Sequence, residues 1–192
     1  MTCWICLDGP DEVGKSTVIA HMSRDLEKAR VEHKIIKEPS KNTLHAAEMG
    51  KGDFLELVRE ERKKTARSLR KYKGLVIFDR SFYSTVAYQH RIETLDGNMN
   101  RILELLLKES RPYDKEPVFE HTFLFIGDAL REHMNYKIQR ECYLNIAETM
   151  GYDIHRTRYY LTDKLHLVPS AWETDRISRN ILSTICWLNN KL

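Results

Sequence analysis

Long apolar runs are missing from this 192-residue chain, and no stretch approaches the length needed to cross a membrane. The apolar segment near the start, Cys3–Leu7, is too short for a secretory signal and lacks its basic lead. The four cysteines show no disulfide-framework spacing, which favours a reducing cytoplasm. A net charge of only +3 gives little support for a nucleic-acid or membrane partner.

Metal-ligand patterns are missing too. Cys3 and Cys6 form a C-x-x-C, but they lie in a predicted strand, where residues three apart point to opposite faces. We therefore interpret them as buried strand cysteines rather than a redox or metal pair. The eight histidines have no ligand spacing. No repeat, low-complexity tract or linker interrupts the chain, so residues 1–192 are predicted to form one domain.

Segments with strand and helix patterns alternate along the chain. The predicted strands are 2–7, 33–39, 74–80, 121–127 and 164–169. The predicted helices are 15–29, 53–72, 100–110, a long polar region from 128 to about 160, and 177–190. This alternation indicates an α/β fold with a five-stranded, doubly wound parallel sheet and flanking helices.

A glycine-rich loop follows the first predicted strand. The segment "GPDEVGKS" matches G-x-x-x-x-G-K-[ST], with Gly9, Gly14, Lys15 and Ser16 at the fixed positions. Backbone N–H groups of such a loop, together with a helix N-terminus, favour a bound phosphate. Lys15 is predicted to reach the β- and γ-phosphates of ATP, and the Ser16 hydroxyl to hold Mg²⁺. The predicted ATP-binding residues are Gly9, Glu12, Val13, Gly14, Lys15, Ser16 and Thr17.

A second motif, "IFDRSFYSTVAYQ", begins in the third predicted strand. An acid at the carboxyl end of a central strand lies beside the glycine-rich loop, so Asp79 is placed to hold the metal through water. Arg80 can make a bidentate contact with a phosphate. The base-reading N-K-x-D of a GTPase is absent. By fold analogy, small chains of this kind are most often nucleotide or nucleoside kinases.

These two motifs together resemble the thymidylate kinase family. That family carries D-R-x-x-x-S-x-x-A-[YF]-[QT], matched here by Asp79, Arg80, Ser84, Ala87, Tyr88 and Gln89. It also carries an acid inside the loop, matched by Asp11, and an R-E-P after the second strand, answered by Lys37, Glu38 and Pro39. The resemblance implies a P-loop NTPase fold with a short lid, ATP as phosphoryl donor, Mg²⁺ as cofactor and a homodimer.

The resemblance also implies residues for the acceptor. In the family the loop acid accepts a hydrogen bond from the 3′-hydroxyl of a deoxynucleotide, a role that falls on Asp11. An acceptor-phosphate arginine is expected on the helix before the central strand, where Arg59 and Arg62 are the alternatives, and Phe54 lies near the position of a base-stacking phenylalanine. The predicted substrate-binding residues are Asp11, Glu38, Phe54, Arg59, Arg80, Ser84, Tyr88 and Gln89.

The chain departs from the family pattern at several positions. Ser81 replaces an aromatic residue or histidine, and "SKN" replaces a "GGT". Glu12 stands where some members have a catalytic arginine, so the missing charge is expected from a lid over about residues 128–145, which contains Arg131 and Arg140. The predicted catalytic residues are Lys15, Arg80, Arg131 and Arg140.

The predicted reaction is transfer of the ATP γ-phosphoryl group to a deoxynucleoside monophosphate, with dTMP the first choice. A deoxynucleoside kinase is the alternative, because "DRS" is similar to the E-R-S of that class and Glu38 could serve as its general base. A kinase acting on DNA ends would need a basic groove. A non-catalytic nucleotide-binding module is disfavoured by the combination of Lys15, Ser16, Asp79 and Arg80.

Overall fold

The computed structural model describes residues 2–115, 117–127, 133–152, 161–169 and 173–188. Within these ranges the chain forms one sheet of parallel strands in the order β2-β3-β1-β4-β5. The strands are β1 (Cys3–Asp8), β2 (His33–Lys37), β3 (Leu75–Asp79), β4 (Phe119–Gly127) and β5 (Thr162–Pro169). The predicted parallel α/β sheet is therefore confirmed.

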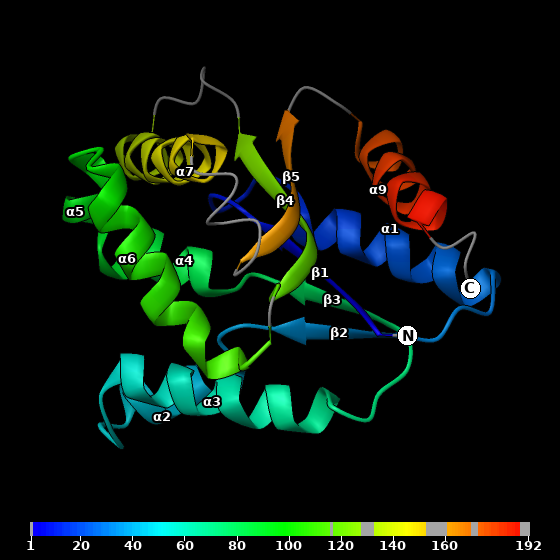
Figure 1. Cartoon of the computed structure of the whole chain (residues 1–192), viewed down its shortest axis with the longest axis horizontal. Coiled ribbons are helices and arrows are strands. Elements are labelled where there is room, and N and C mark those ends of the chain that lie inside the picture. Colours follow the sequence, from blue (N-terminus) through cyan, green and yellow to red (C-terminus); the bar gives the residue numbers. More distant parts are fainter. Residues whose placement is uncertain (1, 116, 128–132, 153–160, 170–172, 189–192) are drawn as a thin grey trace.

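Helices cover both faces of the sheet (Figure 1). One face is covered by α1 (Lys15–Lys28) and α9 (Thr174–Leu188), which pack on each other. The other face is covered by α3 (Phe54–Leu69), α4 (Phe82–Gln89), α6 (Met99–Ser110) and α7 (Met134–Tyr152). Two short helices, α2 (Lys41–Glu48) and α5 (Arg91–Leu95), and the 3₁₀ turn η1 (Arg111–Tyr113) complete the described elements.

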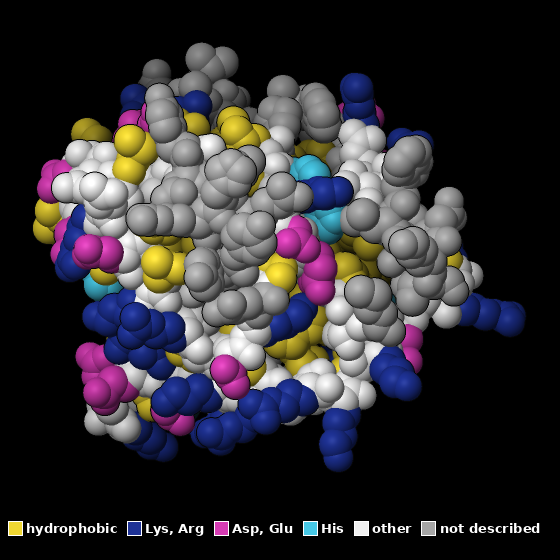
Figure 2. Space-filling model, in the orientation of Figure 1, with side chains coloured by type: hydrophobic (Ala, Val, Ile, Leu, Met, Phe, Trp, Pro, Cys, Tyr) yellow, Lys and Arg dark blue, Asp and Glu magenta, His cyan; other side chains and the backbone are white. Residues whose placement is uncertain are grey.

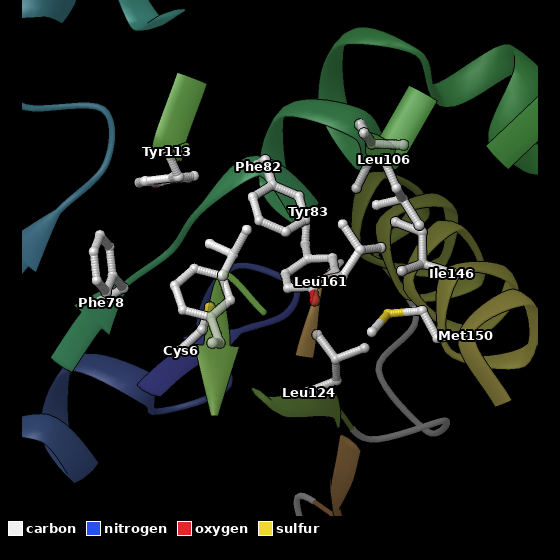
Figure 3. Close-up of a cluster of buried hydrophobic side chains, with 14 of the residues drawn as sticks. Cys6, Phe78, Phe82, Tyr83, Leu106, Tyr113, Leu124, Ile146, Met150 and Leu161 are labelled. Atoms are coloured by element: carbon white, nitrogen blue, oxygen red, sulfur yellow. The ribbon is translucent and has the colours of Figure 1, made fainter. Parts of the chain in front are cut away.

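The larger of the two hydrophobic clusters is rich in aromatic rings. Phe78, Phe82 and Phe119 pack with ring centroids 5.1–5.6 Å apart, and each ring is fully buried. In Figure 3, Phe82 and Tyr83 from α4 lie in the middle of the cluster. Cys6 and Phe78 of the sheet lie on one side of them, and Ile146 and Met150 of α7 lie on the other. This cluster therefore joins α4 and α7 to the strands that carry the glycine-rich loop.

Side-chain caps explain where several helices begin. Ser40, Asp53, Ser81 and Asn98 each accept a hydrogen bond from a backbone N–H in the first turn that follows. Such caps satisfy donors that have no partner inside the helix. The Ser40 cap starts α2 within the "SKN" segment, for which the sequence pattern predicted no helix, and the Ser81 cap starts α4.

The element boundaries need correction at several points. The helix predicted to run to Tyr72 ends at Leu69, and the strand predicted to start at His121 starts at Phe119. Of the polar helical region predicted from 128 to about 160, residues Met134–Tyr152 form α7, and 128–132 and 153–160 lie outside the described residues. The predicted lid overlaps this helix: residues 134–145 belong to α7, in which Tyr143 is fully buried.

The two strand cysteines lie on opposite faces, as their spacing predicts. Cys6 belongs to the aromatic cluster, whereas Cys3 packs against the cluster under α1 and α9. Burial raises the pKa of Cys3 to about 12 and that of Cys6 well above its ordinary value, so both remain thiols. None of the described helices is long and apolar enough to span a membrane.

Gly9 is a position at which the backbone of a neighbouring strand leaves no room for a side chain. Its φ is +144°, and a Cβ atom there would lie 2.3 Å from the backbone oxygen of Phe125 in β4. We expect Gly9→Ala to lower the free energy of unfolding by about 2 kcal/mol or more, through overpacking and backbone strain. Urea denaturation checks this. Gly151→Ala in α7 is the control, because among the described residues no atom beyond its chain neighbours and its own helix backbone lies within 4 Å of the added methyl group. Equal unfolding midpoints for the two variants would contradict the prediction.

Candidate functional site

The glycine-rich loop joins β1 to α1 at the carboxyl edge of the sheet. Gly14, with φ +86°, is the N-cap of α1, and Glu12 also has a positive φ of 60°. Lys15 is buried, and its ammonium donates to the Gly9 carbonyl oxygen at 2.9 Å and to the Pro10 carbonyl oxygen. The lysine therefore lies folded over the loop, at a helix N-terminus that favours anions.

Asp8, the last residue of β1, holds the base of this loop. Its fully buried carboxylate accepts hydrogen bonds from the N–H groups of Gly9, Ser81 and Ser84. It also accepts from the hydroxyls of Ser81, Ser84 and Tyr143, at 3.0, 2.6 and 2.7 Å. Buried polar groups are costly unless they are hydrogen-bonded, and here all the donors are supplied by the loop, α4 with its N-cap, and α7. Asp8 thus fixes these elements relative to one another.

Ser16 and Asp79 face each other across the start of α1. The Ser16 hydroxyl donates to Asp79 Oδ2 at 3.3 Å, and both residues line the same cleft. A hydroxyl and a carboxylate oxygen are hard ligands of the kind that Mg²⁺ prefers, with water and phosphate completing its shell. The pair therefore fits Mg²⁺ bound together with a nucleotide. Within the described residues there is no group of three or more His, Cys, Asp or Glu side chains that would hold a metal by itself.

A cleft of about 740 Å³ opens beside the loop. Its volume is in the range typical of small-molecule sites. It brings together residues from the loop, the end of β2, the starts of α2 and α3, and α4. The lining residues are Asp11, Glu12, Val13, Gly14, Lys15, Ser16, Thr17, Lys37, Glu38, Pro39, Leu44, Phe54, Asp79, Arg80, Ser84, Thr85, Tyr88 and Gln89.

Arg80 makes the main ion pair of the cleft. It has a positive φ of 72°, forms a salt bridge with Asp11 Oδ1, and donates to the Tyr88 hydroxyl at 3.0 Å. Burial raises the pKa of Tyr88 to about 12, so its hydroxyl stays protonated. From α7, Gln139 donates to Asp11 Oδ2 at 3.1 Å and accepts from the Asp11 N–H at 3.0 Å. The loop acid is therefore bound by both an arginine and an amide.

A chain of buried charges lies behind the cleft. Arg62, fully buried, donates to Glu38 at 2.9 Å, to the Thr85 hydroxyl at 2.6 Å and to Glu109. Tyr113 also donates to Glu38. Burial raises the pKa of Glu38 above its ordinary value, although Arg62 and Tyr113 oppose the shift. Each of the buried charged groups Glu38, Arg62 and Glu109 therefore has a partner of opposite charge within the protein, as burial requires.

Both candidate acceptor-phosphate arginines, Arg59 and Arg62, are held in this network, and neither reaches the cleft. Arg59 pairs with the fully buried Glu109 through two hydrogen bonds, of 2.6 and 3.3 Å. Arg62 is occupied by Glu38, Glu109 and Thr85. Neither arginine lines the cleft. Lys37, which the sequence pattern did not single out as a site residue, is exposed, lines the cleft and stands in register with Asp79.

Most of the other predicted site residues line the cleft, and four residues need separate description. Gly9 does not line it but binds Lys15 through its carbonyl group. Ser84 lines it, yet its hydroxyl donates to Asp8. Arg140 does not line it; its Nε is buried without a hydrogen-bond partner among the described residues. Arg131 lies outside the described residues.

The sequence analysis did not assign several residues that contribute to the site, among them Asp8, Lys37 and Gln139. Asp8 could have been found, because an acid that ends an apolar strand directly before a glycine-rich loop must be paired once it is buried. Gln139 gave no signal, because the 128 residues that separate it from Asp11 hide the contact.

The outer surface near α2 and α3 carries many Lys and Arg side chains with acidic side chains among them (Figure 2). Such mixed charge is typical of a solvated helix face. Comparison with known proteins adds no family: no protein-family model matches the chain, and no curated protein matches it.

The position of Lys15 makes anion binding at the loop depend on pH. Burial, and then the nearby Arg80, lower its pKa from the ordinary value of 10.5 to about 8. The ammonium is present below pH 8 and is lost as the pH rises through that value. We therefore expect calorimetry to show that Mg²⁺-free ATP binds more weakly at pH 9 than at pH 7. Lys15→Arg stays protonated throughout this range and should lose most of the dependence. A wild-type affinity that is constant from pH 7 to 9 would contradict the prediction.

Proposed function

We propose that this chain has a P-loop NTPase fold and transfers the γ-phosphoryl group of ATP to a deoxynucleoside monophosphate, with dTMP as the first choice. The observation that carries the proposal is the meeting of Lys15, Ser16 and Asp79 with Asp11 and Arg80 in one cleft. The first three are suited to a triphosphate and its metal, and the other two to a phosphorylated sugar. A simple nucleotide-binding module would need no second set.

The donor half of the site consists of the loop and the start of α1. Inward N–H groups and the helix N-terminus favour the β-phosphate, and Lys15 exchanges its two carbonyl partners for phosphate oxygens. Ser16 and Asp79 would hold Mg²⁺, which neutralises charge on the β- and γ-oxygens. In this half the chain contributes positioning and positive charge rather than covalent chemistry.

The acceptor half combines Asp11 of the loop with residues from the ends of β2 and β3, the start of α3 and the end of α4. Arg80 and Lys37 are the cations that reach the cleft there, and a guanidinium matches phosphate through two parallel hydrogen bonds. Phe54 offers an aromatic face, and Gln89 a polar amide able to pair with the edge of a pyrimidine. Asp11 accepts a hydroxyl of the sugar. A site built to pair such groups rejects a ligand that leaves them unpaired.

The proposed reaction is an in-line displacement. An oxygen of the acceptor phosphate attacks the γ-phosphorus while the bond from that phosphorus to the β–γ bridging oxygen breaks, and ADP leaves. No general base is needed, because the attacking oxygen already carries negative charge. Lys15 and Arg80 offset the repulsion between the two anions and stabilise charge on the transferred group.

A deoxynucleoside kinase is the second candidate, and one observation favours it. Glu38 lines the cleft, and burial raises its pKa, as expected for a general base that must remove a proton from a 5′-hydroxyl. Its carboxylate is, however, held by Arg62 and Tyr113. It would have to exchange one of these partners before it could accept a proton.

A panel of acceptors tests the proposal. We expect ATP-dependent ADP release with dTMP and none with thymidine, because the acceptor half is built around a phosphate. Lys15→Ala should lower kcat by about 100-fold or more, the usual loss when one preorganised donor is removed. dUMP, dCMP, dGMP and ribothymidine monophosphate complete the panel. Activity with thymidine but not with dTMP would overturn the proposal in favour of the second candidate.

The acceptor-phosphate cation gives a separate test. Lys37→Ala is expected to raise KM for the monophosphate by about tenfold, the equivalent of one hydrogen bond to a charged group, with little change in KM for ATP. Arg59→Ala is the matched comparison, because Arg59 is held by Glu109 behind the cleft. It should leave that KM nearly unchanged. The reverse outcome would mean that Arg59 turns into the cleft when the acceptor binds.

A further inference from the structure

Gln139 makes a two-point contact with the loop acid, Asp11, although the two residues lie 128 positions apart in the sequence. The Asp11 N–H donates to Gln139 Oε1, and Gln139 Nε2 donates to Asp11 Oδ2. A primary amide is suited to this task, because it offers a donor and an acceptor side by side. The side chain of Asp11 is 52% exposed, so water could satisfy its carboxylate without Gln139. The contact is therefore not required by burial.

The same helix holds the loop at a second point, one turn away. Tyr143 follows Gln139 by four residues, so both side chains lie on one face of α7. Tyr143 donates to Asp8 at 2.7 Å, and Gln139 is hydrogen-bonded to Asp11. Helix α7 therefore binds the loop on both sides of Gly9 and Pro10. Because Tyr143 is fully buried, α7 is a rigid support for the more exposed Gln139 contact.

The two oxygens of Asp11 have different partners. Oδ2 accepts from Gln139, and Oδ1 is paired with Arg80. In the proposed function Arg80 is also the ligand of the acceptor phosphate. Phosphate and Asp11 then compete for one guanidinium, and the dianion is the stronger partner. When Arg80 turns to the phosphate, Oδ1 becomes available to another donor, whereas Oδ2 remains held.

We propose that Gln139 is a positioning residue for Asp11. When Arg80 leaves Asp11 to bind the acceptor phosphate, Gln139 keeps the Asp11 carboxylate oriented toward the acceptor sugar. This inference rests on the proposed function. Gln139 does not line the cleft and touches no ligand itself. It holds Oδ2 and the backbone N–H, so that Oδ1 is presented to a hydroxyl of the sugar. Without Gln139 an exposed carboxylate would be free to rotate toward solvent, and the energy of the sugar contact would be lost.

The expected consequence is a selective loss of sugar recognition. Gln139→Ala should lower kcat/KM for dTMP by about tenfold, the worth of one well-placed hydrogen bond to a charged group, and mainly through KM. For 2′,3′-dideoxythymidine monophosphate, which has no hydroxyl to offer, the change should be less than about twofold. KM for ATP should stay the same, because Lys15 and Ser16 do not contact Gln139.

The experiment compares wild type, Gln139→Ala, Gln139→Glu and Lys137→Ala with both acceptors, by steady-state kinetics and by calorimetric binding. Gln139→Glu sets a second carboxylate against Asp11 and should lose at least as much selectivity as Gln139→Ala. Lys137 is an exposed residue of the same helix and serves as the matched control. Thermal unfolding midpoints show whether each variant is folded.

The outcomes separate the two proposals. If wild type phosphorylates dTMP and Gln139→Ala keeps its preference for dTMP over the dideoxy compound, the positioning role is wrong while the proposed function stands. An equal loss with both acceptors, or a raised KM for ATP, assigns Gln139 a structural role and overturns the inference. If wild type neither binds nor phosphorylates any monophosphate, the proposed function and the inference are overturned together.

Discussion

The buried carboxylate of Asp8 is the constraint on which the rest of the site depends. It ends the central strand and has no water to solvate it, so its partners must come from other parts of the chain. They come from the glycine-rich loop, from α4 with its N-cap Ser81, and from α7. Because one side chain satisfies donors from all three, none of them can shift without leaving a polar group unpaired. The geometry of the cleft follows from this single point of attachment.

Lys15 and Arg80, two of the cations that line the cleft, are already paired with groups of the protein. Lys15 binds two loop carbonyls, and Arg80 binds Asp11 and Tyr88. An anion that binds to Lys15 or Arg80 must therefore replace their protein partners. Its binding free energy is the difference between the contacts that form and the contacts that are lost. This arrangement limits binding of simple anions. It favours a ligand that supplies both a phosphate for Arg80 and a hydrogen-bond donor for the carboxylate that Arg80 releases.

The sequence was enough to predict the parallel sheet, the position of the loop and most of the cleft lining, because these depend on local patterns. A strand that ends in Asp79 and Arg80 must place both residues beside the loop that follows β1. It was not enough to predict the fate of Arg59 and Arg62. Both lie on α3, where an arginine can bind either a ligand or an acidic residue of the protein. They bind Glu109, which is buried and lies about fifty residues away in the sequence, so the sequence pattern gave no sign of this contact. The short helices α2, α4 and α5 were missed because too few residues carry their periodicity.

The central position of β1 has a consequence for how the chain folds. β1 is hydrogen-bonded on one side to β3 and on the other to β4, yet it is synthesised before the other four strands of the sheet. At about 5–20 residues per second, roughly 6 to 22 s separate the synthesis of Asp8 from that of Phe119, where β4 begins. During that time the edge of β1 that pairs with β4 is unpaired, the other edge is also unpaired until β3 is made, and Asp8 lacks the hydrogen bond from Tyr143 of α7. The cleft therefore cannot be completed by the N-terminal half alone, although that half contributes every described residue that lines it.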